Sequence, residues 1–144
     1  MRTSEEFSVH VENHPWLEGF VSVSFVPLPP QCTELLPNAK ADWLSSNLGY
    51  GVLGDKWQTV SHATFEAQLI DSLKLSLAYS VEMLPPEEAS SVAKEFLKFF
   101  DSQPEYLVNG TQHGWNPITR STMETAYVVV TRTQAGMFLF EDED

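Results

Sequence analysis

The strictest pattern in this sequence is an alternation of apolar and polar residues over residues 73–83. Apolar side chains occupy every second position: Leu73, Leu75, Leu77, Tyr79, Val81 and Met83. Because successive side chains of a strand point to opposite faces, this period predicts a strand with one face on the core. A helical stripe through Phe65, Leu69 and Leu73 competes, but it leaves Leu75 outside. We therefore predict a strand from residue 73 onward, and the state of residues 65–71 stays open.

A long helix is predicted after this strand, over about residues 86–100. Pro85 and Pro86 suit the first turn of a helix, and Glu87 and Glu88 favour its positive end. Apolar side chains then follow at spacings of three and four, as on the buried face of a helix: Ala89, Val92, Ala93, Phe96, Leu97 and Phe100. We expect this face to share one core with the preceding strand through Leu77, Val92 and Phe96.

The C-terminal part of the chain predicts a β-hairpin. Residues 125–131 are apolar on both faces, which is typical of a central strand that is covered on both sides. Residues 133–136 can turn the chain into a second apolar strand at residues 137–140. Residues 109–122, which precede the hairpin, are predicted to form a loop.

The N-terminal half predicts shorter elements. Alternation indicates strands at residues 7–11 and 21–25, and residues 56–60 indicate a third. A short helix is expected at residues 38–47, with Gly49 as its stop. The resulting order of strands, helix, strands, helix and hairpin predicts an α+β fold with a mainly antiparallel sheet.

Length and composition indicate one folded domain. A chain of 144 residues with 42% hydrophobic residues can bury its own core. Cys32 is the only cysteine, so no internal disulfide can form, and residues 1–6 lack the basic and apolar character of a signal peptide. No apolar run approaches the length of about 20 residues that crosses a bilayer. We expect a single cytoplasmic α+β domain over residues 1–144, with flexible tails at residues 1–6 and 141–144.

The chain carries a large surplus of acidic residues. It contains 20 Asp and Glu against 8 Lys and Arg, which gives a formal net charge of −12. The surplus is shared equally between the two halves of the chain. Such a charge repels nucleic acid and anionic membranes and attracts basic proteins. We therefore expect a basic protein partner, such as a toxin domain, and no nucleic acid or membrane ligand.

No motif in the sequence identifies a catalytic centre, a cofactor or a metal. His10 and His14 have the spacing of two zinc ligands on a helix, but the segment is predicted as strand and turn, without a third ligand. Cys32 has no catalytic signature or nearby base, and a free cysteine often packs as a small hydrophobe. Paired acids such as Glu87 and Glu88 are frequent in so acidic a chain. We expect a protein that is not an enzyme and holds no cofactor or metal.

The candidate partner-binding residues fall in two segments. The first segment is residues 110–120, which are predicted to form a loop between the helix and the hairpin. In this loop Trp115 can anchor a partner and Arg120 can hold an anion, and His113 lies in the same loop. The alternative is that Trp115 folds back over the core and Arg120 pairs with a surface acid. The second segment is the acidic C-terminal run, which can contact a partner or protect the last strand against aggregation: Glu141, Asp142, Glu143 and Asp144.

These features favour a non-catalytic binding or inhibitor protein. Small acidic domains without a catalytic signature are typical of bacterial immunity proteins, which neutralise a cognate toxin. An acidic surface speeds capture of a basic toxin cleft and excludes its anionic substrate, and a DNA-mimic inhibitor is a variant of the same logic. Two other classes stay open: a small enzyme or ligand-binding domain that uses residues 110–120, and a structural subunit that self-associates through an apolar sheet face.

Overall fold

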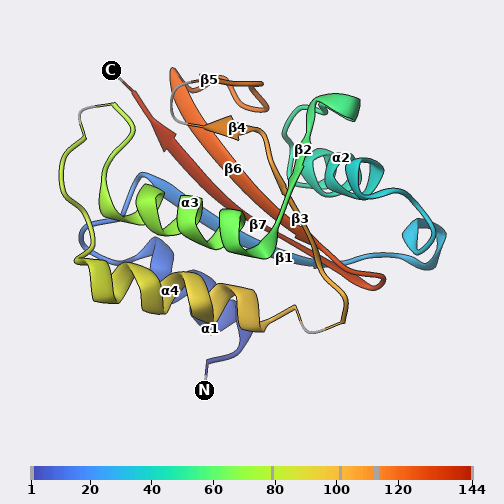
Figure 1. Ribbon diagram of the computed structural model, residues 1–144, viewed down its shortest axis with the longest axis horizontal. Helices are drawn as coiled ribbons and strands as arrows, with labels where there is room; N and C mark the ends of the chain where they lie inside the picture. The colour runs from blue at the N-terminus through green and yellow to red at the C-terminus, as the bar shows by residue number, and fades with distance from the viewer. Residues whose placement is uncertain (1, 79, 101, 112–113, 144) are drawn as a thin grey trace.

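An antiparallel sheet organises the fold (Figure 1). The structure is a computed structural model that describes residues 2–78, 80–100, 102–111 and 114–143. Within these residues the main sheet has five strands, which lie in the order β1 (Val21–Pro27), β7 (Gln134–Asp142), β6 (Met123–Val130), β3 (Glu105–Val108) and β2 (Gln58–Val60). The predicted C-terminal hairpin is confirmed as β6–β7, and Ala135 pairs with Val130 where it begins. A small two-stranded ribbon of β4 (Gly110–Thr111) and β5 (Gly114–Trp115) stands apart.

The helices cover the sheet on both faces. Helices α1 (Ser4–Glu12), α3 (His62–Lys74) and α4 (Pro86–Lys98) pack on one face, and α2 (Pro37–Asn47) packs on the other. Short 3-10 turns occur at Pro30–Cys32 and Gly54–Lys56. The predicted α+β class, single domain and mainly antiparallel sheet are confirmed, and the helix predicted at residues 86–100 is α4.

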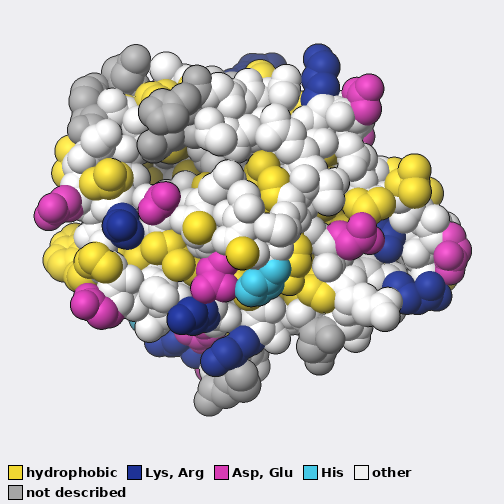
Figure 2. Space-filling view, viewed as in Figure 1, with side chains coloured by type: hydrophobic (Ala, Val, Ile, Leu, Met, Phe, Trp, Pro, Cys, Tyr) yellow, Lys and Arg dark blue, Asp and Glu magenta, His cyan; other side chains and the backbone are white. Residues whose placement is uncertain are grey.

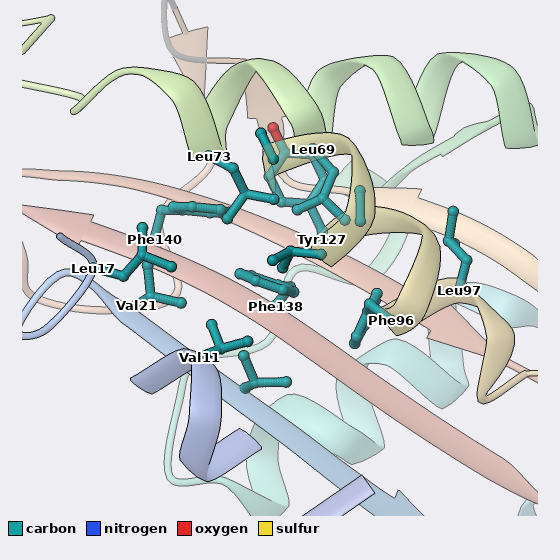
Figure 3. Close-up of a cluster of buried hydrophobic side chains, with 14 of the residues drawn as sticks. Val11, Leu17, Val21, Leu69, Leu73, Phe96, Leu97, Tyr127, Phe138 and Phe140 are labelled. Carbon is teal, nitrogen blue, oxygen red and sulfur yellow. The ribbon is translucent and has the colours of Figure 1, made fainter. Parts of the chain in front are cut away.

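The two faces of the central hairpin bury two separate cores. On the side of α1, α3 and α4, Phe96 meets Phe138 edge-on, with 5.3 Å between the ring centroids (Figure 3). The ring centroid of Phe7 lies 6.5 Å from that of Phe138. On the side of α2, Leu44 and Met137 belong to the second cluster. A fully buried side chain of this size contributes about 1.5–3 kcal/mol by leaving water. The expectation that residues 125–131 form a strand buried on both faces is therefore confirmed.

Residues 7–11 belong to α1, so the predicted strand there is wrong. The Thr3 hydroxyl accepts the backbone N–H of Glu6, and the Glu6 carboxylate accepts the N–H of Thr3. This reciprocal pair satisfies two amides that the start of a helix leaves open, and its hydrogen bonds hold the pKa of Glu6 below its ordinary value. Phe7 and Val11 share the buried face, whereas Val9 is 59% exposed.

Residues 62–74 form α3, so the strand predicted from residue 73 is also wrong. Ser61 caps α3 by accepting the N–H of Thr64, and Leu69 and Leu73 are buried on its inner face. The helical stripe that competed with the alternation is therefore the one that the chain adopts. The segment left open in the sequence, residues 65–71, is helical throughout.

The second half of the alternating run is a tight turn at residues 75–82, here called the 75–82 turn. An antiparallel bridge joins Leu75 to Glu82, and the Ser76 N–H donates to the Val81 carbonyl. Val81 is 59% exposed, and Leu77 reaches only the edge of the core, so the expected burial of Leu77 with Val92 and Phe96 is partial. Tyr79, which was part of the predicted strand, lies outside the described residues.

Two further expectations need correction: residues 134–136, predicted as a turn, already belong to β7, and the predicted loop at residues 109–122 contains the short strands β4 and β5. Two other expectations are confirmed. Strand β1 contains residues 21–25, and α2 matches residues 38–47, with Gly49 at a positive φ of 86° just after it. Residues 56–60 contain only the short strand β2. The tails are shorter than expected, because Ser4–Glu12 is helical and Gln134–Asp142 extends β7 to include Glu141 and Asp142.

Strand β1 forms one edge of the sheet. The Glu141 N–H donates to the Phe20 carbonyl, and because hydrogen bonds alternate along an antiparallel pair, the amide of Val23 points away from β7. The Glu12 carboxylate, at the end of α1, accepts that amide at 2.7 Å. Pro27 has no amide hydrogen to offer. Two positions of the outer edge are therefore closed to a further strand.

Candidate functional site

A groove of about 670 Å³ lies where three segments meet at one end of the sheet. The segments are the loop between α1 and β1, the 75–82 turn between α3 and α4, and the end of β7, which Figure 1 shows at the same end of the molecule. We call this the acidic groove. Its walls are lined by aromatic, aliphatic and acidic side chains: Trp16, Phe20, Val81, Glu82, Glu141 and Glu143. Met83, Ser76, Ser121 and Asp142 also line it.

The apolar part of the acidic groove is unusually open to solvent. Trp16 is 53% exposed, Phe20 is 39% exposed and Val81 is 59% exposed, although each side chain is large and apolar. Figure 2 shows hydrophobic and acidic side chains side by side at the left end of the face drawn there. Exposed apolar side chains that gather in one hollow are typical of a surface that contacts another molecule.

The acidic part of the groove is held in place by hydroxyl groups. The Ser121 hydroxyl donates to Oε2 of Glu141 at 2.5 Å, and the Thr122 hydroxyl donates to Oε2 of Glu143. Glu82, on the 75–82 turn, lines the same groove. Ion pairs in the described part of the chain involve other acidic residues, so Glu82, Glu141 and Glu143 form no ion pair there.

The acidic residues of this region affect the pKa of a nearby tyrosine, Tyr50. Burial raises the pKa of Tyr50 above its ordinary value, and the negative charges of Glu141 and Glu12 raise it further, because a phenolate is disfavoured near other anions. The shift therefore has the direction expected of a phenol that is partly buried near the carboxylates of Glu141 and Glu12.

Asp142 has a structural position in the groove. Its side chain is 8% exposed, and its two carboxylate oxygens accept the backbone N–H groups of Ala78 and Glu143, each at 2.9 Å. The bond to Ala78 fastens the 75–82 turn to β7. Ser80 in this turn has a positive φ of 51°, which is uncommon for a residue with a side chain. Asp142 therefore fixes one wall of the groove and is not free to contact a partner.

His14 positions the loop that carries Trp16. Its Nε2 lies 2.8 Å from Oε1 of Glu88 on α4, and its Nδ1 accepts the backbone N–H of Trp16 at 3.2 Å. The ring of His14 also lies 5.8 Å from the ring of Trp16. His10 instead contacts Arg2, so the two histidines have separate partners. The described residues contain no group of three side chains that could hold a metal ion.

The segment at residues 110–120 is fastened to the sheet by a buried carboxylate. Glu124 on β6 is fully buried, and its carboxylate accepts the N–H groups of Ile118 and Thr119 and the Thr119 hydroxyl at 2.6–2.9 Å. It also accepts the side-chain amide of Asn109 at 2.9 Å. This network replaces the water shell that a buried carboxylate would otherwise need. Asn109, the start of an Asn-Gly-Thr sequence, is fully buried.

The predicted site residues do not come together as one site. Trp115 on β5 is half-buried and Arg120 is exposed, and neither lines the acidic groove. Glu141 and Glu143 do line it, whereas His113 and Asp144 lie outside the described residues. Cys32 is buried, with 2% of its surface exposed. The prediction for residues 110–120 stays a prediction, whereas Glu141 and Glu143 of the acidic run lie in the groove.

Trp16, Phe20 and Val81 were missed as site residues from the sequence. Val81 was assigned to the apolar face of the predicted strand at residues 73–83, where it would be covered, and Phe20 lies just outside the predicted strand at residues 21–25. Only the turn residues around Trp16, with Gly19 at a positive φ of 87°, signal that this segment leaves the core. Their exposure depends on tertiary contacts that no local pattern encodes.

Comparisons with known proteins assign no role to this groove. The chain matches no protein-family model, and no curated protein or solved structure is similar to it. In the part of the chain that the structure describes, the helices are all too short or too polar to cross a bilayer. The class is therefore defined by its architecture: an α+β domain with an exposed apolar groove between unpaired carboxylates.

Proposed function

We propose that this protein is a non-catalytic binding or inhibitor protein that engages a basic protein through the acidic groove. One observation carries the proposal: exposed Trp16, Phe20 and Val81 share a hollow with the carboxylates of Glu82, Glu141 and Glu143. Apolar side chains supply affinity when they are covered, and the surrounding charge selects the partner and speeds its approach.

The sign of the charge favours a cationic partner. The formal net charge of −12 acts at long range, and the groove adds local carboxylates that form no ion pair with the described residues. Nucleic acid would be repelled by both. The partner class that fits is a protein with a basic surface, and a toxin whose cleft binds nucleic acid or nucleotides is an example.

Within this class we propose a bacterial immunity protein that neutralises a cognate toxin. An acidic inhibitor that covers a basic cleft competes directly with the anionic substrate of the toxin. A cytoplasmic location belongs to the same proposal, and the single, buried Cys32 fits a reducing compartment.

The test is capture of a partner from the source cells with wild-type protein and groove variants. We expect Trp16→Ala and Glu82→Gln to weaken binding of the captured protein by about tenfold or more, because a central aromatic anchor and its neighbouring charges carry most of the affinity. Val52→Ala removes another exposed apolar side chain, which is 61% exposed, and serves as the matched control. Glu105→Gln makes the same change in charge beside Val130, at the opposite end of the sheet from Asp142.

The rate of association gives the second readout. It should fall as salt rises, because the Debye length shrinks from about 10 Å at 0.1 M to about 3 Å at 1 M. A partner that binds the groove variants as tightly as the wild type would contradict the proposal, and so would tight binding of nucleic acid to the protein itself.

A further inference from the structure

We infer that the acidic groove receives an arginine side chain of the partner. This inference rests on the proposed function and specifies the chemistry of the same site. The groove offers an exposed indole ring, Trp16, and carboxylates from two separate segments: Glu82 from the 75–82 turn, and Glu141 and Glu143 from the end of β7 and the residue after it. A side chain that is both cationic and flat satisfies the ring and the carboxylates at once.

The carboxylates on the β7 wall are oriented before any ligand arrives. Glu141 is the penultimate residue of β7, and Glu143 directly follows that strand. Both hydroxyl bonds, from Ser121 and Thr122, fall on the Oε2 atoms. Each Oε1 atom accepts no bond from the described residues and can receive a donor. Carboxylates held in this way lose little side-chain entropy on binding, which favours a ligand with several donors.

An arginine fits this arrangement better than a lysine. The guanidinium group is planar, is weakly hydrated and carries five N–H donors, so it can lie against an aromatic ring and bond to carboxylates in its plane. An ammonium group is compact and strongly hydrated, and its bonds have no common plane. The aliphatic stem of the arginine would lie along the apolar wall that Phe20, Val81 and Met83 form.

The neighbouring contacts keep the ring available. His14 contacts Trp16 at a ring distance of 5.8 Å and bonds to its backbone, yet the Trp16 side chain remains 53% exposed. The other wall is equally fixed, because Asp142 holds the 75–82 turn that carries Glu82. The groove can therefore bind a guanidinium group without rearrangement of either wall.

The test uses three peptides that differ at one position: acetyl-Gly-Leu-Xaa-Leu-Gly-amide, with Xaa as arginine, lysine or citrulline. Citrulline has almost the shape of arginine but no charge. Binding is followed by NMR through the indole N–H signal of Trp16, which is assigned by its loss in Trp16→Phe. We expect the arginine peptide to shift this signal and to bind at least about tenfold more tightly than the citrulline peptide, a difference of about 1.4 kcal/mol. The lysine peptide should bind less tightly than the arginine peptide.

The charge requirement is tested on the protein side. Glu82→Gln should lower the affinity for the arginine peptide and leave that for the citrulline peptide unchanged, whereas Glu105→Gln should change neither. Equal affinity for arginine and citrulline, or an arginine peptide that leaves the Trp16 signal in place, would overturn the inference. A captured partner that needs Trp16 but binds equally well after its surface arginines are changed to lysine would overturn this inference alone. A partner indifferent to Trp16→Ala would overturn the proposed function with it.

Discussion

Tyr127 is the residue on which the polar contacts of the larger core depend. Only 2% of its surface is exposed, its hydroxyl donates to the Gln68 carbonyl at 2.9 Å, and it lies 2.5 Å from the Ser72 hydroxyl. These bonds join β6 to α3 inside an otherwise apolar cluster. Burial raises the pKa of Tyr127 well above its ordinary value, because a phenolate inside the core would lose its hydration.

This shift predicts how stability depends on alkaline pH. Because the pKa is higher in the folded state than the unfolded value of about 10, the folded state holds the proton more tightly. The contribution of Tyr127 is complete below pH 10 and is lost as the pH rises above it. Tyr127→Phe should cost about 1–3 kcal/mol at pH 7, because Ser72 and Gln68 lose their partner. At pH 11 the difference from the wild type should be smaller, and urea unfolding at both pH values measures it.

Tyr106→Phe is the control for this prediction. Tyr106 packs against Phe65 at 5.1 Å but is only half-buried, and burial raises its pKa too. Its replacement should therefore change the dependence on pH in the same direction but by less. A cost of Tyr127→Phe that stays constant up to pH 11 would mean that the hydroxyl does not titrate with unfolding.

Among the elements, the 75–82 turn depends most on a single distant residue. Asp142→Ala removes the acceptor for the Ala78 N–H and leaves the rest of β7 in place. We expect the Ala78 amide to exchange with deuterium at least about tenfold faster, because the turn then opens without breaking the core. Hydrogen exchange followed by NMR measures this directly.

Asp71→Ala is the matched control for the turn. Asp71 precedes the turn on α3, its side chain is 76% exposed, and its carboxylate lies 3.8 Å from Lys74. Its removal takes away the same charge but no bond to the turn, so Ala78 should exchange at the wild-type rate. If Asp142→Ala also left this rate unchanged, the turn would be held by its own bonds and not by β7.

The sequence predicted the elements whose pattern has a single interpretation. Helix α4 combines a proline start with a continuous apolar face, and the β6 run is apolar on both faces, so both were found. Helices α1 and α3 were missed because residues spaced by four also fall on the even spacing of a strand. The capping pair of Thr3 and Glu6 was the local signal that could have decided the first case.

The site was predicted less well than the fold, for a physical reason. Glu141 and Glu143 were predicted because an acidic run is visible in a sequence. The groove in which they lie was not predicted. Trp16 and Val81 become neighbours in one groove only after α1, α3 and β7 have packed. The alternating pattern that failed as a strand contains Val81, which lies exposed in the groove instead of in the core.

For the whole molecule, the closed edge of β1 should prevent self-association. Glu12→Ala frees the Val23 amide on the outer edge of the sheet, where a strand from a second molecule could then pair. We expect this variant to self-associate at concentrations where the wild type keeps its oligomeric state. Light scattering across a concentration series measures the molecular mass of both. Glu5→Ala, on the same helix and with the same change in charge, is the control. Equal behaviour of the two variants would show that Glu12 does not protect the edge.

The pairing of β1 with β7 also determines when the protein can fold during synthesis. Val21 pairs with Phe140 and Pro27 with Gln134, so the edge of the sheet joins segments that almost the whole chain separates. A nascent chain that lacks β7 has no partner for β1, and β6 lacks one of its two neighbouring strands. The sheet can therefore close only after almost all of this sequence has been synthesised, and such long-range strand pairing slows folding.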